Sequence, residues 1–176
     1  MPVFEYMDSG KSLKAEAAKR ITQYNVPPKE EKMRIFIIGT IKKSAEVFFG
    51  LIKTNGITTF IDIRLNNTSQ LAGFSKAGDL EYFLREICGC DYKHELIFAP
   101  TKELMDGKKT NGLSNAQYET EYRRLMDERQ ALSYFSETYG KHENLCLLCS
   151  EETPENCHRQ VLADMIANES DILKHL

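Results

Sequence analysis

The chain has 176 residues, of which 41% are hydrophobic and 28% are charged. This length suits one domain with a sizeable core, and the composition is that of a water-soluble globular protein. The net charge of -3 excludes a general attraction to polyanions, so a protein that coats nucleic acid is not favoured.

The five cysteines, an odd number, predict reduced thiols rather than a disulfide framework. The first residues lack the basic and apolar stretches of a secretory signal, and no apolar run approaches the ~20 residues that span a bilayer. We therefore expect a cytoplasmic protein with no membrane partner. The sequence indicates no oligomeric state.

Residues 1–32 predict an N-terminal helical extension and linker. Ser12 is the expected N-cap, and Pro27 with Pro28 ends the helix because neither ring can donate to a helix ladder. One face of this helix carries Leu13, Ala17, Ile21 and Tyr24. Residues 33–176 then form a single predicted α/β domain.

The domain opens with a predicted βαβ unit. Residues 35–38 are a continuous apolar run that ends at Gly39-Thr40, which is typical of a strand buried on both faces of a parallel sheet. Residues 44–56 follow with a serine-capped helical pattern, and residues 58–64 predict the next strand. We expect the two strands to be parallel.

Strands and helices continue to alternate beyond this unit. A helix capped by Asp79 is expected to end at Gly89. Residues 91–98 predict a further strand, and residues 99–116 predict a long loop, which is often functional or mobile.

The longest helix is predicted over about residues 117–139, where Gly140 stops it. A strand over residues 145–149 and a helix with Thr153 as N-cap and Pro154 as first residue complete the domain. This alternation predicts an α/β fold with a mainly parallel central sheet and helices on both faces, a three-layer sandwich.

Residues with reactive or charged side chains follow three of the predicted strands, at the carboxyl ends where parallel sheets bind ligands. Side chains alternate along a strand, so Asp62 shares a face with Arg64, and Cys149 shares one with Glu151. If the strands are neighbours, these four side chains are expected to converge on one cleft. The three strand ends are Gly39-Thr40, Asp62-Ile63-Arg64 and Cys149-Ser150-Glu151.

The last helix is expected to open with Cys157, His158 and Arg159 in its first turn. Unpaired N–H groups and the positive end of the helix dipole favour a thiolate or a bound anion there. Cys149 or Cys157 would be the nucleophile or redox thiol, and Glu151 or His158 its acid–base partner.

A second group of residues is predicted to bind the substrate. Arg64 and Arg159 would hold an anion, because a guanidinium matches carboxylate and phosphate geometry. Gly39 and Thr40 end the first strand beside them, and Tyr118 near the start of the longest helix would face the cleft.

Structural alternatives stand beside these roles. Cys149 on an apolar strand also suits a small buried hydrophobe, and Asp62 with Arg64 suits an ion pair that orders a loop. Cys149, Cys157 and His158 do not follow a standard zinc pattern, and no fourth ligand is evident. The sequence therefore predicts no metal and implies no cofactor.

Several segments together carry a family resemblance: Ile38-Gly39-Thr40, Asp62-Ile63-Arg64, Gly73-Phe74-Ser75-Lys76, Tyr92-Lys93-His94, Tyr118 with Tyr122, and Cys149-Ser150-Glu151 with Cys157-His158-Arg159. They resemble the family catalogued as domain of unknown function 488, over about residues 34–166. The resemblance implies an α/β domain with a polar cleft. It implies no particular activity.

The leading hypothesis is a thiol-dependent enzyme that acts on a small anionic or nucleotide-like substrate in a cleft at the carboxyl ends of the strands. The alternative is a non-catalytic binding module for a nucleotide, a nucleic-acid end or a protein partner. In that case the lysines of the predicted loop, Lys102, Lys108 and Lys109, would line its surface.

Overall fold

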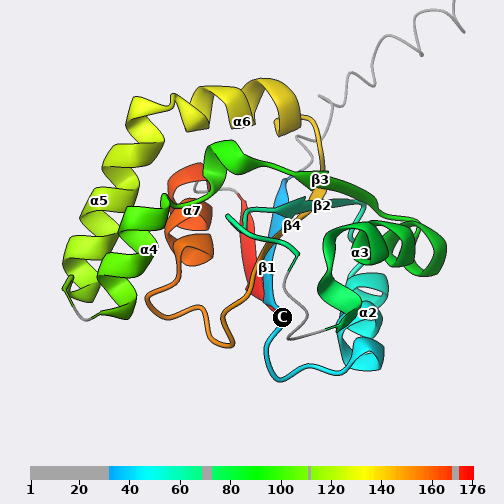
Figure 1. Cartoon of the computed structure of the whole chain (residues 1–176). Coiled ribbons are helices and arrows are strands. Elements are labelled where there is room, and N and C mark those ends of the chain that lie inside the picture. Colours follow the sequence, from blue (N-terminus) through cyan, green and yellow to red (C-terminus); the bar gives the residue numbers. More distant parts are fainter. Residues whose placement is uncertain (1–31, 69–72, 111, 168–170) are drawn as a thin grey trace, which may run out of the picture. The chain divides into compact units, whose positions relative to one another are not determined.

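The structure is a computed structural model that describes residues 32–68, 73–110, 112–167 and 171–176 (Figure 1). The chain from Lys32 onward forms one compact unit. The predicted N-terminal helix lies outside the described residues.

A parallel sheet of five strands forms the centre of the described residues. Its strand order is β3-β2-β4-β1-β5, and every neighbouring pair is parallel, as predicted for the central strands. The strands are β1 (Arg34–Gly39), β2 (Thr59–Asp62), β3 (Asp91–His94), β4 (Asn144–Cys149) and β5 (Ile172–His175).

Helices cover both faces of the sheet, so the three-layer α/β prediction is confirmed (Figure 1). Short 3-10 segments η1 (Gly73–Ser75) and η3 (Leu96–Phe98) and a π-helical turn η2 (Leu84–Cys88) complete the elements. The helices are α2 (Ala45–Thr54), α3 (Ala77–Phe83), α4 (Lys102–Lys109), α5 (Asn115–Glu128), α6 (Ala131–Tyr139) and α7 (His158–Ile166).

Two apolar cores lie on opposite faces because side chains alternate along each strand. Ile35 and Ile37 of β1 pack into the core shared with α5, α6 and α7. Phe36 and Ile38 of the same strand pack against α2 and α3. Continuous apolar runs therefore mark strands that are buried on both sides.

The central strand β4 lies between β1 and β2 and brings their carboxyl ends together. Gly39 of β1 is in register with Cys149, whereas Asp62 of β2 is in register with Leu148. The strand ends therefore meet at one edge of the sheet, but Asp62 and Cys149 lie on opposite faces of it.

Residues 99–116, which the sequence predicted as a long loop, contain the helix α4. Thr101 caps it by accepting a hydrogen bond from the backbone N–H of Leu104 at 3.2 Å. Two lysines in the last turn complement the helix dipole. The prediction was wrong because Gly107 and the many polar residues mask the helical pattern of a short surface helix.

The single long helix predicted over residues 117–139 is in fact two helices, α5 and α6. Gln130 separates them with φ 53° and ψ 37°, in the left-handed region. Gln is a good helix former, so the local sequence carries no signal for this break. Gly140 follows the last turn of α6, as predicted.

The last helix begins later than predicted. Thr153 and Pro154 precede it, and the N-cap is Cys157, one residue before the first residue of α7. A turn closed by the bond from Cys157 N–H to Pro154 O, at 3.1 Å, occupies the predicted first turn. Asn156, with φ 59°, redirects the chain there and prevents an earlier helix start.

Other boundaries differ less. The strand predicted over residues 91–98 ends at His94, and η3 follows. The helix with the predicted cap Asp79 already begins at Ala77, and Gly89 ends the following π-turn with a left-handed φ of 62°. The edge strand β5 was not predicted, because its short run of mixed polar and apolar residues shows no clear period.

Arg129 at the end of α5 anchors that helix to the segment that follows β3. Its Nη1 donates to three backbone carbonyls, those of Leu96 at 3.2 Å, Ile97 at 2.9 Å and Ala99 at 2.6 Å. One guanidinium thus satisfies a set of acceptors that would otherwise lose their partners on folding.

We expect Arg129→Gln to lower the free energy of unfolding by roughly 2 kcal/mol, because three hydrogen bonds from a charged donor are lost, two of them partly buried. Arg124 on the same helix provides the control. It pairs with the exposed carboxylates of Glu121 and Glu128, so Arg124→Gln should cost less than about 0.5 kcal/mol. Urea denaturation measures both, and equal losses would contradict the anchoring role.

Candidate functional site

Two thiols meet where the carboxyl end of β4 faces the start of α7. The Sγ atoms of Cys149 and Cys157 are 2.9 Å apart, and both side chains are fully buried. The backbone N–H of Glu151 donates to the Cys149 Sγ at 3.3 Å. The loop over residues 150–156 folds back so that strand end and helix start contribute one thiol each.

Arg159 is the second residue of α7 and is 2% exposed. Its Nη1 contacts the Cys149 Sγ at 2.6 Å and the Glu151 carbonyl at 2.8 Å, and its Nη2 donates to the Glu152 carbonyl at 3.4 Å. No carboxylate of the described residues forms an ion pair with this guanidinium. The group that can neutralise it is the Cys149 thiolate.

The two thiols therefore differ in acidity. Burial by itself would raise the pKa of Cys149, but hydrogen bonding from Cys157 and the charge of Arg159 outweigh it and lower the pKa. The pKa of Cys157 is raised because it donates to Cys149 and is itself buried. Of the two thiols, Cys149 is thus the one that more readily loses its proton, and Cys157 is the hydrogen-bond donor that stabilises the anion.

Gly39 at the end of β1 makes this arrangement possible. A Cβ atom at this position would lie 1.7 Å from the Glu151 carbonyl oxygen and 3.0 Å from Arg159 Nη1. The binding role of Gly39 stays a prediction. Its observed role is to leave room for the carbonyl that orients the guanidinium.

His158 and the stacked rings of Tyr118 and Tyr122 lie on one side of the thiol cluster. Burial, followed by the nearby charges of Lys108 and Arg159, lowers the pKa of His158 to about 3, so its imidazole is neutral at physiological pH. Its Nδ1 is 4.0 Å from the Cys157 Sγ. Its ring lies 5.8 Å from that of Tyr122.

Tyr118 is 3% exposed and stacks on Tyr122 with a centroid separation of 6.4 Å. The pKa of Tyr118 is raised by burial and by the negative charge that Cys157, Glu151 and Cys149 can carry. Its hydroxyl therefore stays protonated at neutral pH.

Glu151 contributes through its backbone rather than its carboxylate. The N–H and C=O groups contact Cys149 and Arg159, whereas the half-exposed carboxylate lies 3.8 Å from Lys108. The ammonium of Lys108 also lies 4.8 Å from the centroid of the Tyr118 ring. The acid–base role predicted for the Glu151 side chain stays a prediction, and the contacts of this residue with the cluster are made by its main chain.

Asp62 and Arg64 form a separate polar cluster on the α2 face of the sheet. Arg64 binds Asp62 in a bidentate manner, with Nε–Oδ1 at 2.8 Å and Nη2–Oδ2 at 2.6 Å. Tyr92 donates to Asp62 Oδ2 at 2.7 Å, and the Ser75 carbonyl accepts from Arg64 Nη2 at 2.9 Å. The expected convergence with Cys149 does not occur, because the register pairs Asp62 with Leu148.

An open pocket of about 500 Å³ lies at the carboxyl ends of β1, β2 and β4, and we call it the strand-end pocket. Its lining includes two sequence-predicted residues, Thr40 and Arg64. Sequence reasoning missed Lys42, Lys43 and Ser150, although each follows a strand end where such sheets bind ligands. Their position after the strand ends could have identified these residues, although they belong to no recognisable sequence motif.

Lys43 connects the strand-end pocket with the thiol cluster. Burial and the positive charge of Arg159 lower the pKa of Lys43, while Glu152 acts in the opposite direction. The backbone between the two sites is shared as well, since Ser150 lines the pocket and directly follows Cys149. The sites are therefore neighbours on opposite faces of the same sheet edge.

The described residues contain no group of three or more His, Cys, Asp and Glu side chains that could hold a metal ion. No helix among them is both long enough and apolar enough to cross a membrane.

We expect a thiolate absorbance at 240 nm that titrates below the ordinary thiol pKa of 9.0, because Arg159 and Cys157 stabilise the Cys149 anion. Cys149→Ser should remove this step, and Cys157→Ala should move it to higher pH. Cys146→Ala is the matched control on the same strand, since burial raises the pKa of Cys146. A low-pH step that survives in Cys149→Ser would contradict the assignment.

Gly39→Ala should lower the free energy of unfolding by more than about 2 kcal/mol, because the new methyl group overlaps a backbone carbonyl and forces strand and loop apart. The control is Gly78→Ala in α3, where a Cβ atom would meet open space. That change should stabilise the helix by up to about 1 kcal/mol. Denaturant unfolding distinguishes the two, and a neutral Gly39→Ala would disprove the close approach.

Comparison with known proteins gives a family but no activity. A search of curated proteins found no match, and a search of solved structures found none either. The family model described as domain of unknown function DUF488 matches residues 44–166, which include the Asp62–Arg64 pair and the whole thiol cluster. The chain therefore belongs to the DUF488 domain family.

Proposed function

We propose that the protein is a thiol-dependent enzyme in which Cys149 is the nucleophile and a small anion is the substrate. The observation that carries this proposal is the contact between a buried guanidinium, Arg159, and the Cys149 Sγ at 2.6 Å. A buried cation without a carboxylate partner is costly for stability alone. Beside a thiol, it holds the reactive thiolate form at neutral pH.

Electrostatics of the strand-end pocket support an anionic substrate. Lys42, Lys43 and Arg64 line it, and no acidic side chain of the described residues does. Two of these cations have carboxylate partners outside the lining, since Lys42 pairs with Glu152 and Arg64 with Asp62. The first turn of α2 also opens there, with backbone N–H groups that have no acceptor within the helix. Phosphate and carboxylate groups are the ligands that such a site favours.

Arg64 is preorganised for this role by its partners on the α2 face. Asp62 and the Ser75 carbonyl hold its Nε and Nη2, whereas Nη1 reaches the Ser75 Oγ only at 3.5 Å. The side chain is 4% exposed and forms part of the pocket wall. A substrate anion can therefore use Nη1 without separating Arg64 from Asp62.

Catalysis in this proposal requires a local rearrangement, because Cys149 has no exposed surface. The Glu151 carbonyl and the loop over residues 150–156 cover its thiolate. An anion that takes over the hydrogen bonds from Arg159 to the Glu151 and Glu152 carbonyls would release that loop and give access to the sulfur. A reducing compartment such as the cytoplasm would keep both thiols free, and we propose this location.

A second function, a non-catalytic anion-binding module, is favoured by one observation. The strand-end pocket is open to solvent, whereas the side chains of both cysteines are fully buried. In a binding module, Arg159 and the thiols would only brace the loop after β4. Binding would then be independent of the sulfur of Cys149.

The test is competitive alkylation of the native protein with iodoacetate, which is anionic, and iodoacetamide, its neutral analogue. Cys88 is the internal control, because it is half-buried and burial raises its pKa. At pH 7 we expect the iodoacetate-to-iodoacetamide rate ratio at Cys149 to exceed that at Cys88 by at least tenfold. Lys43→Gln should reduce the difference, because the positive charge beside Arg159 is lost. Peptide mass spectrometry measures each site.

Two results would count against the enzyme. Preferential labelling of Cys88 by both reagents would show that Cys149 is not an accessible nucleophile. A rise in melting temperature with inorganic phosphate that is equal in the wild type and in Cys149→Ser, without any labelling of Cys149, would support the binding module instead.

A further inference from the structure

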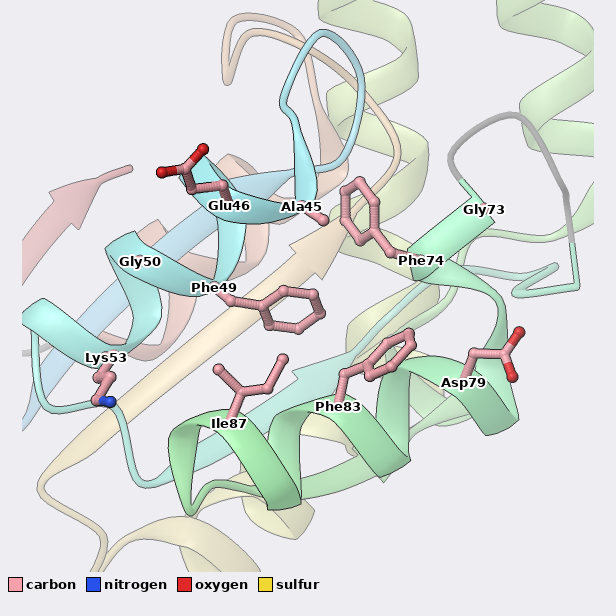
Figure 2. Close-up of a pocket in the computed structure, with 10 residues that line it drawn as sticks. All are labelled: Ala45, Glu46, Phe49, Gly50, Lys53, Gly73, Phe74, Asp79, Phe83 and Ile87. Atoms are coloured by element: carbon pink, nitrogen blue, oxygen red, sulfur yellow. The ribbon is translucent and has the colours of Figure 1, made fainter.

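An apolar groove of about 770 Å³ lies between α2 and the continuous helix formed by α3 and η2. Figure 2 shows the side chains of Phe49, Phe74, Phe83 and Ile87 pointing toward one another into this groove. Its volume is within the ~300–1,000 Å³ typical of small-molecule sites. Neither the thiol cluster nor the proposed anion pocket uses it.

The walls of the groove are regular helix faces. Glu46, Phe49, Gly50 and Lys53 of α2 are spaced by three and four residues, and so share one face. The phenyl ring of Phe49 lies 5.7 Å from that of Phe74 and 5.7 Å from that of Phe83. These mutual contacts fix the rings, so the apolar surface is largely preformed.

The groove and the strand-end pocket share a wall. Ala45, Gly73 and Phe74 line both cavities. From this wall, one cavity continues to Lys42, Lys43 and Arg64, and the other continues to the phenylalanines. A single ligand that crosses the shared wall would meet the cations at one end and the aromatic rings at the other. The carboxylates of Glu46 and Asp79 also line the groove, so the part of the ligand that lies there is uncharged.

We infer that the ligand of this site is an amphipathic anion, in which a compact anionic group is joined to an uncharged aromatic or apolar group. This inference rests on the proposed anionic substrate and defines its class more closely. The anionic group occupies the strand-end pocket beside the start of α2. The apolar group occupies the groove and stacks against Phe49, Phe74 and Phe83.

Gly50 gives independent support. It lies inside α2, where glycine is an unfavourable helix residue, and a Cβ atom there would meet open space. Local packing and backbone conformation therefore do not require a glycine. The absence of a side chain keeps the groove wide between Phe49 and the opposite helix, which a ligand requires and the fold does not.

Titration calorimetry with three stable probes tests the inference on the full chain. Methylphosphonate carries the anion alone, (1-naphthylmethyl)phosphonate carries the anion and an aromatic group, and 1-naphthalenemethanol carries the aromatic group alone. We expect the naphthyl phosphonate to bind at least tenfold more tightly than either of the other two probes.

The variant Gly50→Leu should abolish this gain and leave the affinity for methylphosphonate within twofold of the wild type. Its melting temperature should not fall, because leucine favours a helix more than glycine does. Gly78→Leu is the matched control, since Gly78 is also helical and open to solvent but lies outside the groove. It should leave the affinities for all three probes unchanged.

Ile87→Asn provides a second test at the far end of the groove, where the side chain is 44% exposed and its loss is compatible with folding. It should weaken binding of the naphthyl phosphonate alone. Equal affinities for the two phosphonates, or unchanged naphthyl phosphonate binding in Gly50→Leu, would overturn this inference alone. Failure of both phosphonates to bind would overturn it together with the anion pocket of the proposed function.

Discussion

The buried contact between Arg159 and Cys149 is the interaction on which the arrangement of this end of the molecule depends. A guanidinium that is 2% exposed needs acceptors on every side. The carbonyls of Glu151 and Glu152 supply two of them, and the Cys149 Sγ supplies a third. The glycine at position 39 is required because one of these carbonyls lies against the β1 backbone. Sheet, loop and helix α7 are thus joined through one side chain.

Two separate polar clusters lie at the carboxyl ends of the strands, on opposite faces of the sheet. Arg159 and the thiols lie on the α7 face, and Asp62 with Arg64 lies on the α2 face. Arg159 donates to the Cys149 Sγ and to backbone carbonyls, whereas Arg64 pairs with the Asp62 carboxylate. Lys43 is influenced by both sites, because it lines the pocket and its pKa is lowered by the positive charge of Arg159.

Much of the fold follows from local patterns. The apolar run of β1, the capping of α2 by Ser44, whose Oγ accepts from the Val47 N–H, and the buried β4 were predictable because each depends on neighbours in the sequence. The break at Gln130 and the delayed start of α7 were not, because each depends on a left-handed backbone conformation, at Gln130 and at Asn156, that residue type alone does not predict. Arg129 reaches across to carbonyls that are about thirty residues away. No local propensity encodes such a constraint.

For the candidate site, the sequence by itself determined the set of reactive residues and their position at the ends of parallel strands. Only the tertiary structure decided which of them meet. The strand register places Asp62 opposite Leu148 rather than Cys149, so a difference of one residue assigns the two clusters to different faces. The apolar groove also arises only on folding, since its walls come from helices that are separated in the chain by the whole of β2. Side-chain alternation can be read along one strand, whereas register and facing helices depend on how the whole core packs.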